Sequence, residues 1–227
     1  MLPRLPLDLS TFAILRKSNY VYIDKTKYAY TIITGGRRYF LSRPRRFGKS
    51  LFISTLKEIL DGNKNLFKGL WIEKSDYIWE KYGVIDLDLS SIEVSNSDDL
   101  RTGICSLLKD IAEQYELAIE INSKKPDIAL RALARALYGK FGRVAVLVDE
   151  YDNPILQALN TSKKADDVRK TLDSFFTVIK SLDSFIDFVF ITGVSSLIKA
   201  GPFPGANNFR IITMDKRFSE ICEHSYE

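Results

Sequence analysis

Histidine and cysteine are scarce in this chain, which has one histidine, His224, and two cysteines, Cys105 and Cys222, in 227 residues. A single histidine argues against a multi-histidine metal site and against a histidine-dependent catalytic triad. Two cysteines this far apart make neither a disulfide framework nor a metal cluster, and they favour a reducing compartment. We therefore expect two structural thiols in a cytoplasmic protein.

Long apolar runs are also missing. No stretch approaches the roughly 18 apolar residues of a membrane span, and residues 1–10 lack the continuous apolar segment of a signal peptide, so we expect no membrane partner. The formal net charge is only +4, and this mild excess does not by itself indicate nucleic-acid binding. With 45% hydrophobic residues the chain can bury a substantial core, and its length predicts a single domain over residues 1–227.

Short apolar runs alternate with longer amphipathic stretches, which is the rhythm of an α/β fold. The predicted strands are Arg38–Ser42, Val84–Leu89, Val144–Val148, Phe185–Thr192 and Arg210–Thr213. The predicted helices run from Lys25 to the pair Gly35–Gly36 and over Ser50–Leu60, Asp98–Ile119, Pro126–Tyr138 and Asp166–Leu182. The unbroken run Val144–Val148 predicts a central strand of a mostly parallel sheet that helices cover on both faces, whereas the alternating Val84–Leu89 suits a strand nearer the edge.

A basic loop that contains one glycine, Ser42–Ser50, joins the first strand to the next helix. Its end matches the end of a P-loop, in which backbone N–H groups and the N-terminus of the following helix attract phosphate oxygens. In that interpretation Gly48 lets the backbone approach the nucleotide, Lys49 reaches the β and γ phosphates, and the Ser50 hydroxyl binds Mg²⁺. The alternative is an ordinary glycine turn, but a strand before the loop and a helix after it are the context that a P-loop requires.

Arg43 stands where the general pattern G-x-x-x-x-G-K-[ST] has its first glycine, so the motif is incomplete. We nevertheless predict that the whole loop and the first turn of the helix contact ATP. The predicted ATP-binding residues are Arg43, Pro44, Arg45, Arg46, Phe47, Gly48, Lys49, Ser50 and Leu51.

An acidic pair, Asp149 and Glu150, ends the most apolar strand and resembles a Walker B motif. Carboxylates at this edge are costly unless they meet solvent, a cation or donors, so the pair predicts a metal site, although both may simply cap the following turn. We predict that Asp149 and Ser50 orient Mg²⁺, and that Glu150 polarises the attacking water while Lys49 stabilises charge. Thr192, at the end of the next strand, is the third predicted catalytic residue, as a sensor of the water or the γ-phosphate.

Several other polar residues have open roles. Ser195 and Ser196 offer hydroxyls similar to that of Thr192, and Asp152 either supports the acidic pair or caps the next helix, with capping favoured. The candidates for an arginine finger, acting across the subunit boundary of a homo-oligomer, are Arg169, Arg210 and Arg217, although surface solvation is the default for each. The strongest basic excess surrounds the predicted phosphate site, where the polyanion is ATP, nucleic acid or both; its residues are Arg37, Arg38, Arg43, Arg45, Arg46 and Lys49.

These motifs together resemble the AAA-ATPase-like family, whose members carry a P-loop ATPase domain that a PD-(D/E)XK nuclease-like domain often follows. The matching segments cover nearly the whole chain in the expected order and are Tyr22–Thr26, Tyr39–Ser50, Leu66–Leu70, Val148–Asp152 and Phe190–Ser195. Arg43 belongs to a form of the loop that is typical of this family. The resemblance implies a P-loop NTPase three-layer sandwich of the additional-strand, catalytic-glutamate type, with Asp24–Thr26 near the nucleotide.

The chain stops soon after Arg210–Thr213, so we expect no nuclease-like domain and assign no nuclease activity; a nuclease or nucleic acid remains a possible partner. The first functional hypothesis is an ATP-hydrolysing switch or motor that couples nucleotide state to conformation or assembly. The alternative is a nucleotide-binding interaction module with little or no turnover. Phosphate transfer to an acceptor is a third and weaker hypothesis, because no acceptor-binding element is evident.

Overall fold

The computed structural model describes residues 4–6, 9–159, 162–194 and 209–222. Its centre is a five-stranded sheet in the order β2-β3-β4-β1-β5, in which every pair of neighbours is parallel. The strands are β1 (Arg38–Ser42), β2 (Gly83–Asp88), β3 (Val144–Asp149), β4 (Phe188–Gly193) and β5 (Arg210–Ile211). The predicted parallel sheet, with the alternating strand β2 at its edge, is thus confirmed.

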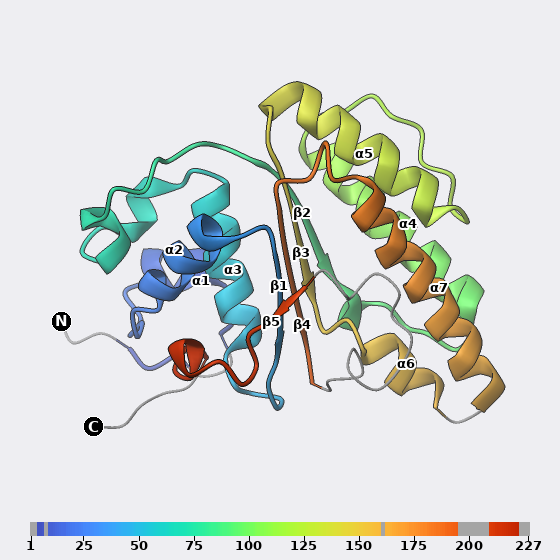
Figure 1. Cartoon of the computed structure of the whole chain (residues 1–227), viewed down its shortest axis with the longest axis horizontal. Helices are drawn as coiled ribbons and strands as arrows, with labels where there is room; N and C mark the ends of the chain where they lie inside the picture. Colours follow the sequence, from blue (N-terminus) through green and yellow to red (C-terminus); the bar gives the residue numbers. More distant parts are fainter. Residues whose placement is uncertain (1–3, 7–8, 160–161, 195–208, 223–227) are drawn as a thin grey trace.

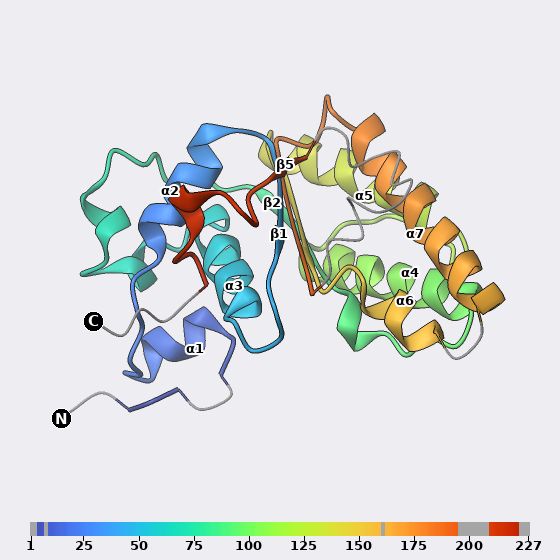
Figure 2. The ribbon, with the colours of Figure 1, turned by 60° about the horizontal axis from the view of Figure 1, so that its bottom comes forward.

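Helices cover both faces of this sheet and make a three-layer sandwich (Figure 1). One face carries α1 (Phe12–Lys17), α2 (Thr26–Gly35) and α3 (Lys49–Leu60). The other carries α4 (Ser97–Gln114), α5 (Pro126–Phe141), α6 (Asn153–Ala158) and α7 (Ser162–Ser181), and Figure 2 shows the same two groups on either side of the strands. Short 3₁₀ turns are η1 (Lys64–Phe67), η2 (Trp71–Lys74), η3 (Leu89–Ser91) and η5 (Lys216–Phe218). No helix in the described ranges is both long and apolar enough to cross a bilayer.

The alternation of side chains along the strands divides the core into two clusters. In β3, Val144, Val146 and Val148 are buried in the cluster that α4, α5 and α7 complete. Ala145 and Leu147 point the other way, into the cluster that α2 and α3 complete. Because every residue of β3 and β4 is buried, these two strands read as continuous apolar runs, and the central position predicted for the first of them is confirmed.

Some element boundaries differ from those predicted. The helix expected over Asp98–Ile119 ends at Gln114, because Glu116 takes up a left-handed conformation with φ 53° that stops the helix. The strand expected from Phe185 begins at Phe188, since the amide of Phe185 donates to the carbonyl of Leu182 in a turn. These shifts are of a few residues and leave the predicted elements in their predicted order, but the helix α1 was not predicted.

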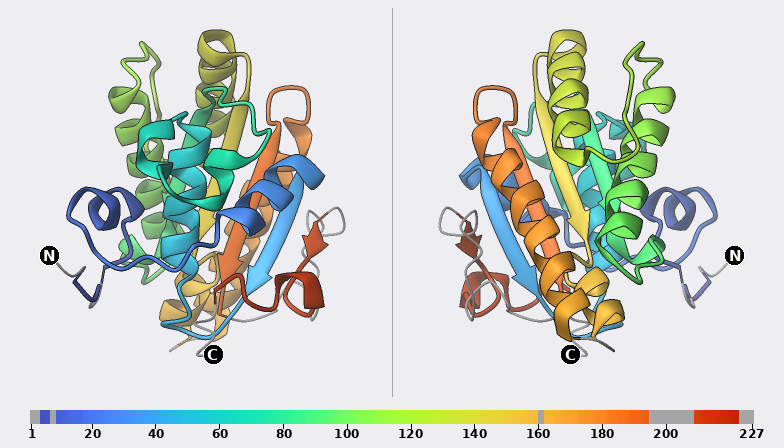
Figure 3. Two further views of the ribbon diagram at one scale, coloured as in Figure 1. Left: turned by 90° about the vertical axis from the view of Figure 1, so that its left-hand side faces the viewer. Right: turned by 90° about the vertical axis from the view of Figure 1, so that its right-hand side faces the viewer.

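The position of β4 between β1 and β3 brings the two predicted motifs to one edge of the sheet. Leu41 of β1 is in register with Thr192 of β4, and Val148 of β3 is in register with Ile191. Figure 3 shows these three strands side by side and pointing in the same direction. The loop after β1 and the acidic end of β3 therefore leave the sheet at the same carboxyl edge, one strand apart.

Candidate functional site

The loop after β1 is curled by two residues in the left-handed conformation, Arg46 with φ 66° and Gly48 with φ 76°. Such a conformation costs a non-glycine residue energy, so glycine suits position 48. A Cβ atom there would also lie 3.3 Å from the carbonyl oxygen of Cys222. Directly after Gly48, α3 begins at Lys49, and its first N–H groups have no partner within the helix. The loop thus ends in a helix N-terminus, the arrangement that attracts phosphate oxygens.

Lys49 is folded back into this loop. Its side chain is buried, with 4% of the residue exposed, and its ammonium nitrogen Nζ donates to the carbonyl oxygen of Pro44 at 3.0 Å. An ammonium in this buried position would gain from an anionic oxygen in place of the neutral carbonyl, because opposite charges attract more strongly where water is excluded. Pro44, Arg45, Arg46 and Phe47 are exposed, and Ser50 and Leu51 are half-buried.

The guanidinium of Arg43 turns away from the loop towards the C-terminal segment. It donates to the backbone carbonyls of Ser42 and Thr213, and its buried Nε has no partner among the residues that the structure describes. The hydroxyl of Thr213 in turn accepts a hydrogen bond from the Ser42 amide at 3.0 Å. The residue that replaces the first P-loop glycine therefore fastens the start of the loop to the segment after β5, a contact that no sequence pattern predicted.

Asp149, the last residue of β3, is buried and held by its neighbours. One carboxylate oxygen, Oδ1, accepts hydrogen bonds from the Thr192 hydroxyl and from the Glu150 amide, the latter at 3.0 Å. Thr192 is fully buried, so its hydroxyl orients Asp149. The second oxygen of Asp149 and the hydroxyl of Ser50 are hard oxygen donors of the kind that Mg²⁺ prefers.

Glu150 has an unusual backbone conformation, with φ 49°. A non-glycine residue in this region is uncommon and persists where its surroundings hold it there. The carboxylate oxygen Oε2 of Glu150 accepts a hydrogen bond from Nδ2 of Asn153 at 3.0 Å. Asn153 was not among the predicted site residues, and its position three residues after Glu150, at the start of a helix, was the available signal.

Cys222 lies against the loop, because a Cβ atom on Gly48 would meet its carbonyl oxygen at 3.3 Å. Burial raises the pKa of its thiol to about 12, with Arg43, Lys49 and Lys25 opposing that rise and Asp149 adding to it. The loop and the acidic strand end leave the same carboxyl edge of the sheet, one strand apart. The described residues contain no group of three or more His, Cys, Asp or Glu arranged to hold a metal ion. A cation here would need phosphate or water oxygens beside Ser50 and Asp149, as is usual for Mg²⁺.

The comparison with protein families agrees with this geometry. The family described as Predicted AAA-ATPase matches residues 6–203. This chain belongs to that family. It is also 38% identical over 224 residues to the "Uncharacterized protein in vnfD 5'region" of Azotobacter chroococcum mcd 1, a match over 98% of this chain and 43% of the relative. The chain therefore spans less than half the length of that relative. No solved structure matches this chain.

In this member of the AAA-ATPase family, Asp152 does not cap the following helix, although its position in the sequence favoured that role. It stands at the N-cap position of α6, but its side chain makes no capping hydrogen bond there. Instead, its two carboxylate oxygens accept from the amide of Val194, each at 3.2 Å. Asp152 thus fixes the chain just after β4, beside the Asp149–Glu150 pair, and the prediction of a helix cap was wrong.

The basic excess predicted around the phosphate site is split by the strand between its two halves. Arg37 and Arg38 lie at the amino end of β1, and Arg43 follows its carboxyl end, about 13 Å or more further along the strand. At the amino end, Arg37 donates to the carbonyl oxygens of Asp183 and Ile186, and Arg38 pairs with the carboxylate of Asp183. Arg37 and Arg38 are therefore not part of the candidate site, and the expectation that they surround it was wrong.

The candidate arginine fingers have intramolecular partners. Arg169 pairs with Asp166 one helical turn away at 3.3 Å, and Arg210 and Arg217 both pair with Asp215. Arg217 is the main cause that lowers the pKa of Asp215 to about 2. These contacts do not test whether any of the three arginines acts across a subunit boundary, and that role stays a prediction. Ser195, Ser196 and His224 lie outside the described residues.

Asp24 and Thr26 have a clear structural role. Asp24 accepts hydrogen bonds from the Thr26 amide at 2.8 Å and from the Trp71 amide at 2.6 Å, and the Thr26 hydroxyl accepts from the Ile72 amide at 3.1 Å. The two side chains therefore fasten η2 to the start of α2. The position of Asp24–Thr26 near the nucleotide, which the family resemblance implies, stays a prediction.

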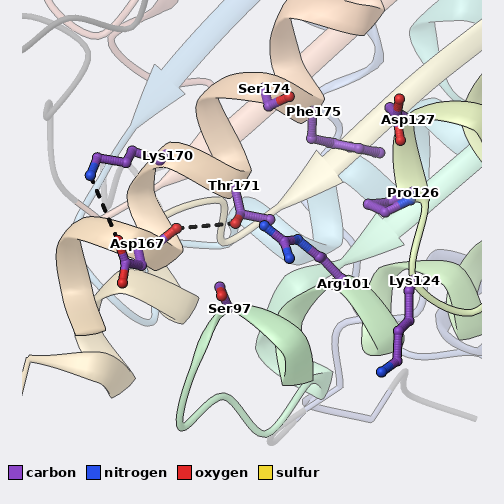
Figure 4. A pocket seen from close by; sticks show the side chains of 10 residues that line it. All are labelled: Ser97, Arg101, Lys124, Pro126, Asp127, Asp167, Lys170, Thr171, Ser174 and Phe175. Carbon is purple, nitrogen blue, oxygen red and sulfur yellow. Dashed lines mark hydrogen bonds and ion pairs between the residues drawn. The ribbon is translucent and has the colours of Figure 1, made fainter. Parts of the chain in front are cut away.

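A separate hollow of about 350 Å³ lies between α4, α5 and α7 and contains none of the predicted site residues (Figure 4). Its charged side chains have mixed signs. Lys170 pairs with Asp167 at 3.6 Å, and Arg101 pairs with Asp98 at 3.2 Å. The hollow therefore has no single charge preference, and the candidate site remains the carboxyl edge of the sheet.

Proposed function

We propose that this chain binds ATP together with Mg²⁺ at the carboxyl edge of the sheet and hydrolyses the γ-phosphate. The observation that carries the proposal is the buried Lys49 ammonium, folded into a curled loop at the N-terminus of α3, one strand away from an Asp149 carboxylate that Thr192 orients. Membership of the predicted AAA-ATPase family supports nucleotide binding. Hydrolysis, the metal and the individual residue roles are the proposal.

In the proposed site the loop and the first turn of α3 hold the triphosphate. Backbone N–H groups of Gly48, Lys49 and Ser50 meet phosphate oxygens, and Lys49 exchanges the Pro44 carbonyl for the β and γ phosphates. The Ser50 hydroxyl and the Asp149 carboxylate hold Mg²⁺, which supplies positive charge that stabilises the phosphate oxygens. Glu150 accepts a proton from the attacking water, and the buried Thr192 hydroxyl keeps Asp149 in place.

Nucleotide binding and single-turnover hydrolysis with two substitutions test this proposal. Lys49→Ala is expected to weaken Mg²⁺-dependent ATP binding by about 100-fold, because it removes a charged donor to phosphate. Glu150→Gln is expected to retain ATP binding and to lower the hydrolysis rate by about 100-fold or more, the range for loss of a general base. Equal ATP affinity in the native chain and in Lys49→Ala would contradict the proposed site.

The same measurements decide between an enzyme and an interaction module. Tight ATP binding by the native chain without turnover would indicate a nucleotide-binding module, and the proposed ATP hydrolysis would then be wrong. The chain spans 43% of the length of its Azotobacter relative, so the assembly or nuclease partner that the nucleotide state would control is also part of the proposal.

Exposed Arg45 and Arg46 beside the exposed ring of Phe47 suit a second polyanion, such as nucleic acid. Such binding must weaken steeply as salt rises, because phosphate contacts release counterions. Titrating single-stranded DNA at two salt concentrations, with Arg45→Ala as the comparison, tests this part. A DNA affinity that does not depend on salt would contradict it.

A further inference from the structure

A chain of side-chain hydrogen bonds leads from Glu150 to the surface. Nδ2 of Asn153 donates to Oε2 of Glu150 at 3.0 Å, and Oδ1 of Asn153 accepts from Nε2 of Gln157 at 2.6 Å. Gln157 then contacts the segment after η3, where Nε2 donates to the carbonyl of Ile92 at 3.0 Å and Oε1 accepts from the amide of Val94 at 2.8 Å. Asn153 and Gln157 lie one turn apart on α6.

The direction of every donor in this chain is fixed by one backbone group. The amide of Val94 can only donate, so Oε1 of Gln157 must face it and Nε2 must face the other way. Oδ1 of Asn153 must therefore accept from Nε2, and its Nδ2 must point at Glu150. A carboxylate can only accept, so each donor between Val94 and Glu150 faces an acceptor.

Both ends of the chain are held firmly. Ile92 and Val94 are buried, and a Cβ atom on Gly103 of α4 would overlap the side chain of Ile92, which shows how closely that segment packs on the helix. At the inner end, the backbone amide of Asn153 also donates to the carbonyl of Glu150 at 2.9 Å. The left-handed conformation of Glu150 is thus supported by the same residue that binds its carboxylate.

We infer that Asn153 and Gln157 are positioning residues for Glu150, and that they tie the catalytic carboxylate to the Ile92–Val94 segment. The inference rests on the proposed function, because it gives Glu150 the role of base. Asn153 donates to Oε2 and restrains the carboxylate, and in this arrangement Oε1 receives the proton of the water. Pre-orientation of this kind raises the rate of the chemical step without adding affinity for ATP.

Steady-state ATP hydrolysis by Asn153→Ala tests the inference. We expect kcat to fall about tenfold with KM and ATP affinity unchanged, because the lost interaction acts only on the base. In the Glu150→Gln background, Asn153→Ala should leave the residual single-turnover rate unchanged, which a merely structural role would not predict.

Two further variants sharpen the test. Gln157→Glu keeps the acceptor for Val94 but cannot donate to Asn153, and it should lower kcat by a smaller factor, about threefold. Asn63→Ala is the matched control, because Nδ2 of Asn63 also donates to a glutamate, Glu58, on the exposed surface. Its kcat should equal that of the native chain.

The outcomes separate this inference from the proposed function. Turnover by the native chain together with an unchanged or increased kcat in Asn153→Ala would overturn the positioning role alone. If the native chain binds ATP without turnover, hydrogen exchange at the Val94 amide decides instead. ATP with Mg²⁺ should change that exchange in the native chain and leave it unchanged in Asn153→Ala, whereas an equal response in both would overturn the connection.

Discussion

The two ends of strand β1 carry similar charges and use them differently. At the amino end, the Arg37 guanidinium binds carbonyl oxygens at 2.8 and 2.6 Å just after the C-terminus of α7, and Arg38 pairs with Asp183. At the carboxyl end, Arg45 and Arg46 are exposed and the buried Lys49 ammonium donates to the Pro44 carbonyl. The guanidinium groups at the amino end are therefore engaged in contacts within the chain, and the carboxyl end has cations ready for an anion.

This difference follows from the direction of a parallel α/β sheet. Helices end near the amino edge, where their last carbonyls and the negative end of the helix dipole stabilise arginine. Helices begin at the carboxyl edge, where free N–H groups repel cations and attract anions. Arg37 and Arg38 are thus structural at the amino edge, whereas Arg45 and Arg46, unlike Arg43, are available for ligand at the carboxyl edge. The four predictions below test this contrast, from the largest expected effect to the smallest.

Gly193→Ala should destabilise the carboxyl edge by about 2–4 kcal/mol, because the new Cβ would overlap the buried ring of Tyr151 and approach Asp152. The Tyr151 ring packs edge-on against Phe40 at 5.4 Å and has little room to move. Denaturant unfolding measures the change. Gly139→Ala, where a Cβ meets open space, is the control and should leave stability equal or raise it slightly.

Thr213→Val should lower the free energy of unfolding by about 1–2 kcal/mol, because the amide of Ser42 loses its hydroxyl acceptor. We also expect weaker ATP binding, since this hydrogen bond fixes the start of the phosphate loop. Thermal unfolding and nucleotide titration of the same variant measure both effects. Unchanged stability would show that the C-terminal segment does not support the loop.

Arg37→Ala and Arg45→Ala should affect different properties, the first the stability of the fold and the second the affinity for ATP. Loss of Arg37 removes its hydrogen bonds to the Asp183 and Ile186 carbonyls and should cost about 1 kcal/mol of stability with ATP affinity unchanged. Loss of exposed Arg45 should leave stability within about 0.5 kcal/mol and weaken ATP binding severalfold, more at low salt than at high salt. If Arg37→Ala weakens ATP binding more than Arg45→Ala does, the contrast between the two edges is wrong.

Cys222 gives the carboxyl edge a dependence on alkaline pH. Burial raises the pKa of its thiol from 9.0 to about 12, so above pH 9 the unfolded chain loses the thiol proton while the folded chain retains it. Fewer protons on the unfolded state mean that stability falls as pH rises from about 9 to 12, by up to about 1.4 kcal/mol per pH unit. The stability difference between the native chain and Cys222→Ala should therefore shrink from pH 8 to pH 10, and a constant difference would contradict the assignment.

The sequence by itself determined the order of elements, the buried parallel strands and the family. It could do so because these features depend on local patterns: continuous apolar runs such as Val144–Val148, amphipathic helices, and a Gly-Lys-Ser tripeptide between a strand and a helix. The same patterns predicted that Lys49 and Asp149 belong to one site, because the carboxyl ends of parallel strands share an edge.

Only the tertiary structure decided which polar side chains meet. That Arg43 binds the Thr213 carbonyl and Asp152 the Val194 amide depends on the register of β4 and β5, which no local pattern encodes. Arg37 and Arg45 cannot be told apart in the sequence, because the charge of a residue does not show which edge of the sheet it will lie at. The contact from Glu150 through Asn153 and Gln157 to Val94 joins residues 56 positions apart and requires α6 to pack beside the end of β2. Hydrogen bonds are short and directional, so such contacts exist only once packing has fixed the backbones that carry them.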